Sequence, residues 1–257
     1  MNFDLNNYNI FIAGGLGEIG SYLAKEFISL NAKVVILYSS NKYFERLNKN
    51  QSRQDLKIIK TNYSDCEKLS QDIIDNSIKN KTNCLVSTVG SGKMNGDYPF
   101  SKEEVLRIWE INYFYNRNLA TAVSEIISKD DNFNPEGKSS HVFTSSIASK
   151  KNVNAPFEYC ASKAALETFI KNLSNHISPL QRINTISPGH IFTDGGTWGQ
   201  KKKNYPFEFK KVVNEIPLKR IGYCKDISFM YLFLLSNYSS YLTGSNIIID
   251  GGISANQ

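Results

Sequence analysis

A tyrosine and a lysine four residues apart, Tyr159 and Lys163, form a chemically suggestive pair. On a helix both side chains project from one face, because residues at i and i+4 lie one turn apart. A phenol with a pKa of about 10 is a poor acid-base catalyst at neutral pH, and a neighbouring ammonium lowers that pKa by stabilising the phenolate. The pair therefore predicts acid-base catalysis, although a random surface pair at this spacing is the alternative.

Two polar residues strengthen the catalytic interpretation. Ser146 lies thirteen residues before Tyr159, just after a predicted strand at residues 141–144. Open α/β folds bind ligands beyond the carboxyl ends of their strands, so this hydroxyl can bond to a substrate carbonyl oxygen. Asn112 lies in a largely apolar stretch of a predicted helix, where asparagine has a poor propensity. Its alternative interpretation is an exposed polar position.

Glycines cluster near the N-terminus, in the segment Ala-Gly-Gly-Leu-Gly-Glu-Ile-Gly at residues 13–20. The segment joins a predicted strand at 9–13 to a predicted helix at 18–30. Glycines there let the backbone approach a pyrophosphate, and the helix N-terminus stabilises its charge. The flanking elements favour dinucleotide binding over a merely tight turn.

The elements that must position these residues alternate along the chain. This alternation predicts one Rossmann-type, doubly wound parallel sheet of about seven strands with helices on both faces. No linker divides residues 1–257, so we expect a single domain. The predicted strands are 9–13, 33–38, 56–60, 84–89, 141–144, 182–187 and 246–250. The predicted helices are 18–30, one starting near the capping box Ser64/Glu67, 101–127 from the capping box Ser101/Glu104, 159–177 and 226–236.

The composition limits the function classes. Of the 257 residues, 41% are hydrophobic and 21% charged, typical of an ordinary globular protein. The net charge of +6 favours acidic partners, but the tightest basic run, residues 201–203, is too short for a nucleic-acid tract and is typical of a solvated loop. No apolar run approaches the ~18 residues that cross a bilayer. We expect neither nucleic acid nor membrane as a partner.

Cysteines and histidines show no metal-binding pattern. Cys66, Cys84, Cys160 and Cys224 lie far apart without CxxC spacing, and no secretory signal precedes them. This predicts neither a disulfide framework nor a zinc site, and a reducing, cytoplasmic location. The histidines at 141, 176 and 190 have no ligand spacing, so no metal site is expected.

The order of these motifs resembles the classical type of the short-chain dehydrogenase/reductase family over essentially the whole chain, including members such as 3-oxoacyl-carrier-protein reductase. The glycine turn comes first, followed by Asn112, Ser146 and the segment 159–163. The later matching positions are Asn184, Pro188, Gly189, Thr193, residues 241–244 and the closing Asp250, Gly251 and Gly252.

The resemblance implies a role for each catalytic candidate. Tyr159 would be the proton donor or acceptor, Ser146 would orient the substrate oxygen, and Asn112 would support a water relay. Lys163 would bind the nicotinamide ribose and lower the pKa of Tyr159, while the cofactor supplies the hydride chemistry. The implied cofactor contacts are Gly14, Gly15, Leu16, Gly17, Ile19, Gly20, Ser39, Ser40, Lys42, Asn62, Tyr63, Thr88, Gly90, Tyr159, Lys163, Pro188, Gly189, Ile191 and Thr193.

Three departures from the family pattern stand out. Glu18 occupies the place of a glycine, so the turn also fits the GxxGxxG spacing of the family's extended members. Those members are longer and lack the Asp-Gly-Gly ending, which favours the classical type. The NNAG motif is reduced to Ser-Thr-Val-Gly at residues 87–90, and Asn62 stands where many members carry an aspartate beside the adenine.

The end of the second predicted strand predicts the choice of cofactor. An acidic residue there would accept the ribose hydroxyls of NAD, but residues 38–42, Tyr-Ser-Ser-Asn-Lys, contain none. Ser39, Ser40 and Lys42 can donate hydrogen bonds to a 2′-phosphate, although no arginine fills the usual basic position. We therefore expect NADPH in preference to NADH.

The function expected is an NADP(H)-dependent oxidoreductase that interconverts a carbonyl and a secondary alcohol, mainly as a reductase. The long segment at 188–224 is expected to be irregular, with a lid at about 190–224 over a small-molecule substrate. Its basic and aromatic residues suit an acidic substrate, such as a carrier-linked acyl chain or a phosphorylated sugar, while sugars, steroids and polyols stay open. The lid residues concerned are Trp198, Tyr205, Phe207, Phe209 and residues 201–203.

Other functions stay open at this point. They are an NAD-dependent alcohol dehydrogenase, an epimerase or dehydratase of the same family, and a dinucleotide-binding protein without catalysis. By analogy with family members, the long helices predicted at 101–127 and 159–177 indicate a homodimer or homotetramer.

Overall fold

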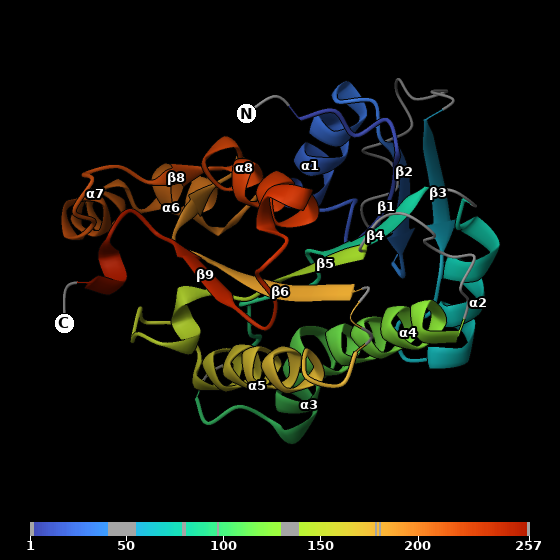
Figure 1. Ribbon diagram of the computed structural model, residues 1–257. Helices are drawn as coiled ribbons and strands as arrows, with labels where there is room; N and C mark the ends of the chain where they lie inside the picture. The colour runs from blue at the N-terminus through green and yellow to red at the C-terminus, as the bar shows by residue number, and fades with distance from the viewer. Residues whose placement is uncertain are drawn as a thin grey trace.

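The computed structural model describes residues 3–40, 55–78, 81–96, 98–129, 139–177, 179 and 181–255. Its main feature is a seven-stranded parallel sheet in the order β3-β2-β1-β4-β5-β6-β9 (Figure 1). The predicted doubly wound fold is confirmed. The strands are β1 (Tyr8–Ala13), β2 (Lys33–Tyr38), β3 (Leu56–Lys60), β4 (Thr82–Ser87), β5 (Ser139–Thr144), β6 (Gln181–Pro188) and β9 (Asn246–Ile249).

The central strands form because their residues can be buried on both sides of the sheet. Every residue of β4, β5 and β6 is buried, as is usual for parallel strands covered by helices on both faces. The strand order reverses direction between β1 and β4. At such a switch point the connections leave toward opposite faces, which opens a crevice beyond the carboxyl ends of the two strands.

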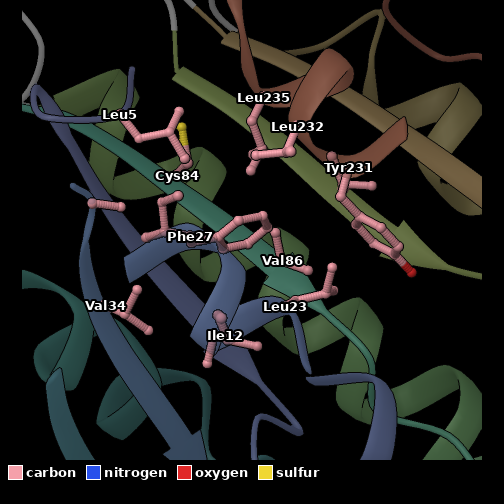
Figure 2. Close-up of a cluster of buried hydrophobic side chains, with 14 of the residues drawn as sticks. Leu5, Ile12, Leu23, Phe27, Val34, Cys84, Val86, Tyr231, Leu232 and Leu235 are labelled. Carbon is pink, nitrogen blue, oxygen red and sulfur yellow. The ribbon is translucent and has the colours of Figure 1, made fainter. Parts of the chain in front are cut away.

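Helices cover both faces of the sheet (Figure 1). One face carries α1 (Glu18–Ser29) and α8 (Cys224–Leu235), whose Phe27 and Tyr231 side chains enter the apolar cluster of Figure 2. The other face carries α2 (Cys66–Asn76), α3 (Lys102–Trp109), α4 (Tyr115–Lys129) and α5 (Phe157–Leu173). Among the residues described, no helix has the length and apolar character needed to cross a membrane.

The helix predicted at 101–127 is interrupted. A π-helical turn, Glu110–Phe114, separates α3 from α4 and contains Asn112. Asn112 Nδ2 donates to Ile108 O at 2.9 Å and also to Ser91 O outside the helix. Side-chain bonds of this kind compete with the regular helical ladder, so a residue that binds a neighbouring loop lies at the break.

The N-terminal cap of α2 also differs from the prediction. Asp65, not Ser64, is the N-cap residue, and its carboxylate accepts a hydrogen bond from Lys68 N at 2.9 Å. Ser64 Oγ instead donates to Glu110 Oε1 at 2.9 Å. The helix therefore starts one residue later than predicted, and Ser64 makes a tertiary contact in place of the cap.

The prediction of an irregular segment at 188–224 was wrong. The segment contains β7 (Ile191–Phe192), α6 (Thr197–Asn204), α7 (Pro206–Glu215) and β8 (Gly222–Tyr223), and β7 pairs with β8. Neither helix has a fully buried residue. α6 is almost wholly polar, whereas in α7 the apolar residues at 209, 212 and 213 recur at helical spacing and were overlooked. Two short helices over the sheet edge therefore replace the predicted loop.

Candidate active site

The glycine turn packs tightly against the residues that follow β4. Gly14 has a φ of 74°, a left-handed conformation that favours glycine. A Cβ atom at Gly14 would lie 2.9 Å from Thr88 Oγ1, and one at Gly20 would lie 2.5 Å from Gly14 O. Both positions thus need glycine, and the turn lies at the crevice between β1 and β4.

The start of α1 suits an anion. Gly17 is the N-cap residue, and no side chain caps the helix. The positive end of the helix dipole is therefore left without a side-chain acceptor. The close backbone turn and the uncapped helix start both fit the pyrophosphate of a dinucleotide.

Tyr63 supports the glycine turn from inside the protein. Its hydroxyl donates to Leu37 O at 2.6 Å and accepts from Gly14 N at 3.2 Å, and the side chain is buried. Tyr63 was predicted as a cofactor contact, but its hydroxyl forms hydrogen bonds within the protein and so links β2 to the glycine turn.

Lys163 is a buried cation beyond the carboxyl end of the sheet. Only 2% of the residue is exposed. Its Nζ donates to Thr144 O at 2.8 Å and lies 3.5 Å from Val89 O. Burial lowers the pKa of Lys163 to about 8, and the carboxylate of Glu167 opposes that change.

Asn112 joins the loop after β4 to Lys163. Its Oδ1 accepts from Ser91 N and its Nδ2 donates to Ser91 O, each at 2.9 Å. A Cβ atom at Gly90 would lie 2.9 Å from Lys163 Nζ and 3.0 Å from Asn112 Oδ1. The asparagine and the lysine therefore meet across Gly90.

Tyr159 completes the group. A Cβ atom at Gly92 would lie 3.6 Å from Tyr159 Cζ, so the loop after β4 also passes the phenol. Burial raises the pKa of Tyr159, and hydrogen bonding to the Ser146 hydroxyl opposes this rise. The predicted lowering by Lys163 is not found, since the ammonium is directed at Thr144 O and burial dominates. The structure nonetheless brings Ser146, Tyr159, Lys163 and Asn112 together.

Comparison with known proteins agrees with this geometry. Residues 15–254 match the family model described as enoyl-(acyl carrier protein) reductase. The chain belongs to the short-chain dehydrogenase/reductase family. It is accordingly an oxidoreductase that acts on CH–OH and C=O groups, from a family that binds nicotinamide dinucleotides.

Several relatives match this short-chain dehydrogenase/reductase over nearly its whole length. Sorbose reductase of Schizosaccharomyces pombe is 29% identical over 260 residues, which cover 97% of each chain. The 3-oxoacyl-carrier-protein reductase of Rickettsia typhi is 26% identical over 258 residues, 97% of this chain and 98% of the relative. The structure of NADPH-dependent 3-quinuclidinone reductase from Rhodotorula rubra matches with a TM-score of 0.79 and 25% identity, covering 98% of this chain and 93% of that chain. The family prediction is confirmed.

The predicted cofactor contacts on the adenosine side follow neighbouring strands. Ser39 and Ser40 follow β2 and are exposed, and Asn62 follows β3. Lys42 lies outside the described residues. Asn62 Oδ1 accepts from Ser64 N at 3.1 Å, which shapes the start of α2. These positions lie at the carboxyl ends of adjacent strands, on the side of β1 away from the catalytic group.

The predicted contacts on the other side of the glycine turn follow β4 and β6. Thr88 Oγ1 lies 3.2 Å from the carbonyl oxygens of Ala13 and Gly14. Gly189 follows Pro188 at the end of β6 and packs so closely that its Cβ would lie 2.7 Å from Asp250 Cα. Further along, Ile191 lies in β7 and Thr193 follows that strand.

Glu167 is a polar residue of this enzyme that the sequence analysis missed. Its Oε1 accepts hydrogen bonds from Ser145 Oγ and Ser149 Oγ at 2.6 Å and from Ser187 Oγ at 2.9 Å. Its Oε2 pairs with Lys150 Nζ at 2.9 Å. Glu167 thus ties α5 to the ends of β5 and β6. Its position four residues after Lys163 is the signal that was available.

Asn116 was missed as well. It is fully buried, with Oδ1 accepting from Ser87 Oγ at 2.6 Å. Its Nδ2 donates to Asn112 O at 3.0 Å and to Val89 O at 3.2 Å. Two asparagines four residues apart, at 112 and 116, in a largely apolar stretch could have indicated that both side chains form hydrogen bonds with the loop after β4.

Proposed function

We propose that this short-chain dehydrogenase/reductase uses NADP(H) to interconvert a carbonyl and a secondary alcohol, with Tyr159 as general acid and base. The observation that carries the proposal is the convergence of Ser146, Tyr159, Lys163 and Asn112 beyond the carboxyl end of the sheet, beside the glycine turn. A bound nicotinamide would supply the hydride chemistry. We also propose that residues 1–257 form one catalytic domain, with a substrate lid at about 190–224.

We assign a separate role in the reaction to Ser146, Tyr159 and Lys163. The Ser146 hydroxyl donates to the substrate oxygen and orients it, and Tyr159 transfers the proton to that oxygen. With its pKa raised, Tyr159 is protonated at neutral pH, which is the state that donates a proton to the substrate oxygen in the reductive direction. Lys163, one helical turn away, would bind the nicotinamide ribose, and with that contact made its ammonium would stabilise the phenolate that remains.

Asn112 positions the wall of the site. Its amide holds Ser91 by two hydrogen bonds, so the loop after β4 stays close to Lys163 and Tyr159. A water relay through Asn112 that resupplies the proton remains our expectation from the family. Replacement of Asn112 tests it through the solvent isotope effect on turnover.

The end of β2 supports NADPH as the cofactor. Tyr38, Ser39 and Ser40 follow one another there without a carboxylate that would repel a 2′-phosphate. The 3-quinuclidinone reductase that resembles this chain is NADPH-dependent. We expect kcat/KM to be higher with NADPH than with NADH, and the reverse order would contradict this assignment.

A ketone panel tests the reaction itself. Consumption of NADPH with a ketone identifies the reaction, whereas tightly bound cofactor that is never consumed would indicate an epimerase or dehydratase. Tyr159→Phe should lower kcat by about 10²–10⁴-fold while the Kd for NADPH stays nearly constant. The exposed Tyr241 provides the control, since Tyr241→Phe should change neither value. Unchanged turnover in the Tyr159 variant would contradict the mechanism.

We further propose a homodimer or homotetramer formed through α4 and α5, by analogy with family members, and a cytoplasmic location. The four cysteines, all among the described residues, are free thiols, which supports a reducing compartment. Sedimentation equilibrium measures the oligomeric state directly.

A further inference from the structure

A cavity of about 520 Å³ lies between the lid and the rest of the molecule. Its walls come from residues 151–154, from His190, from α6, from the end of α7 and from the C-terminal turn at Ile253. The first two wall segments follow β5 and β6, whose carboxyl ends also lead to Ser146 and Pro188. The cavity therefore lies on the catalytic side of the sheet.

The lining of this cavity is positively charged. Three lysines, Lys151, Lys201 and Lys219, face a single acid, Glu215, so the formal charge of the lining is 3 − 1 = +2. A carboxylate of the neighbouring turn, Asp250, accepts from Gly252 N and Ser254 N and is not part of the lining. The surplus of ammonium groups favours an anion in the cavity.

Neutral contacts hold the ammonium groups of Lys201 and Lys219 in place. Lys151 Nζ donates to Ile253 O and Lys219 Nζ to Asn214 O, each at 2.6 Å. Lys201 Nζ lies 4.7 Å from the centre of the Trp198 ring. Contacts with a carbonyl oxygen and a ring orient a lysine without cancelling its charge, so Lys201 and Lys219 are positioned to bind an anion.

His190 adds a neutral hydrogen-bonding group to the same wall. The centre of its ring lies 4.2 Å from the centre of the Trp198 ring. Burial and, to a smaller extent, the Lys201 ammonium lower the pKa of His190 to about 4. At neutral pH the imidazole is uncharged and can donate or accept a hydrogen bond, and the positive charge of the cavity comes from the lysines.

We propose that this cavity binds an anionic group of the substrate, a carboxylate or a phosphate remote from the reacting carbonyl carbon. The inference rests on the proposed function, because it places the reacting end of the same molecule at Tyr159. Ammonium groups form short, charge-assisted hydrogen bonds with both kinds of anion. The lid thus selects the substrate by charge, through Lys201 of α6 and the lysines opposite it.

Binding of unreactive ligands tests the cavity without turnover. We would titrate the protein in complex with NADP⁺ with hexanoate and with hexanol, and with glucitol 6-phosphate and with glucitol, by calorimetry. At least one anionic ligand should bind about tenfold more tightly than its neutral partner. The pair that shows the larger difference distinguishes carboxylate from phosphate. Equal affinities within both pairs would overturn the proposal.

The neighbouring lysine supplies a matched control. Lys201→Met should reduce the preference for the anion to about threefold or less. Lys202 follows in the same helix, but its Nζ lies over the Phe192 ring at 5.2 Å and it does not line the cavity. Lys202→Met should therefore leave the preference unchanged, and equal losses in the two variants would contradict a specific site. Melting temperatures of both variants verify that they are folded.

Kinetics separate a failure of this inference from a failure of the proposed function. The substrates are oxo acids with their methyl esters and ketose phosphates with their free ketoses. We expect the anionic member to have the higher kcat/KM, mainly through a lower KM. Equal kcat/KM within every pair would reject the anion site and leave the proposed reaction intact. Lysine-dependent binding without consumption of NADPH by any substrate would reject the reaction and leave the anion site intact.

Discussion

Two buried cations, Lys163 and Arg182, lie at opposite ends of the sheet and bind the same kind of partner. Lys163 is 2% exposed and Arg182 is 4% exposed. The Lys163 ammonium donates to main-chain oxygens after β4 and β5. The Arg182 guanidinium, near the start of β6, donates to Leu234 O at 3.0 Å and Ser236 O at 2.9 Å, where α8 ends.

The two side chains differ in the number of short hydrogen bonds that they donate. Arg182 also donates to Ser239 Oγ at 2.8 Å, so its planar group closes the C-terminus of α8, where the helix dipole favours a positive charge. Lys163 has one short contact and lies beside Asn112 and one turn from Tyr159. A buried charge thus stabilises the fold at the amino end of the sheet, whereas the buried charge at the carboxyl end is the one for which we propose a chemical role.

The largest expected effect is on activity. Lys163→Met should lower kcat/KM by about 10²–10⁴-fold, because the nicotinamide ribose loses its ammonium partner and, with the cofactor bound, the phenolate loses a stabilising charge. The free energy of unfolding should change by no more than about 1 kcal/mol, since loss of the bond to Thr144 O is offset by relief of a buried charge. The exposed Lys171 in the same helix is the control, and steady-state kinetics with urea unfolding measures both quantities. A large loss of stability in the Lys163 variant would show that Lys163, like Arg182, stabilises the fold, and would contradict the difference that we describe.

Arg182→Met should show the opposite pattern. Removal of the guanidinium leaves the carbonyl groups at the end of α8 without donors, and we expect a loss of about 3 kcal/mol in the free energy of unfolding. The kcat of the folded protein should stay within about twofold, because Arg182 lies at the far end of the sheet. Urea unfolding and kinetics at low temperature test this. A stable variant with greatly reduced kcat would refute the assignment.

Acid should weaken the amino end of the sheet through His141. This buried imidazole accepts a hydrogen bond from Leu85 N at 3.1 Å, and burial, with a smaller effect of Arg182, lowers its pKa to about 3. The unfolded chain binds a proton near pH 6.5 and the folded protein does not. The free energy of unfolding should therefore fall as pH decreases below 6.5, by up to about 1.4 kcal/mol per pH unit.

His141→Asn should make this pH dependence shallower, since the amide oxygen can still accept from Leu85 N. His190, whose pKa is about 4, accounts for part of the remainder. The exposed His176 provides the control, and thermal unfolding from pH 7 to pH 4 is the measurement. An unchanged slope in the His141 variant would show that this imidazole does not govern acid stability.

The smallest expected effect concerns Glu167. Its carboxylate raises the pKa of Lys163 against burial, so kcat/KM should fall as pH rises through about 8 in the wild-type protein. Glu167→Gln should move that fall to lower pH and reduce kcat/KM at pH 7 by a factor of about 5. A pH profile from 6 to 10 tests this. A reduced kcat/KM with an unmoved pH profile would indicate a purely structural role through the three serines.

Local spacing was sufficient to predict much of the site. The turn at residues 13–20 and the pair Tyr159 and Lys163 were recognisable because neighbours in sequence stay neighbours on a turn or a helix. The strands were recognisable because buried parallel strands are continuous apolar runs. The polar helix α6 lacks an apolar pattern and was predicted as part of a loop, and α7 was missed with it although its apolar residues at 209, 212 and 213 have helical spacing.

Residue types and their order therefore established the family, the parallel sheet and the four catalytic candidates, because each depends on periodicity or on a short motif. The tertiary structure decided what those residues touch. Burial, and not the neighbouring ammonium, has the largest effect on the pKa of Tyr159. The side-chain oxygen of Asn112 accepts a hydrogen bond from the main chain of Ser91. The partners of Glu167 come from the ends of β5 and β6. Contacts across strands depend on packing of segments far apart in the chain, which spacing along the sequence does not encode.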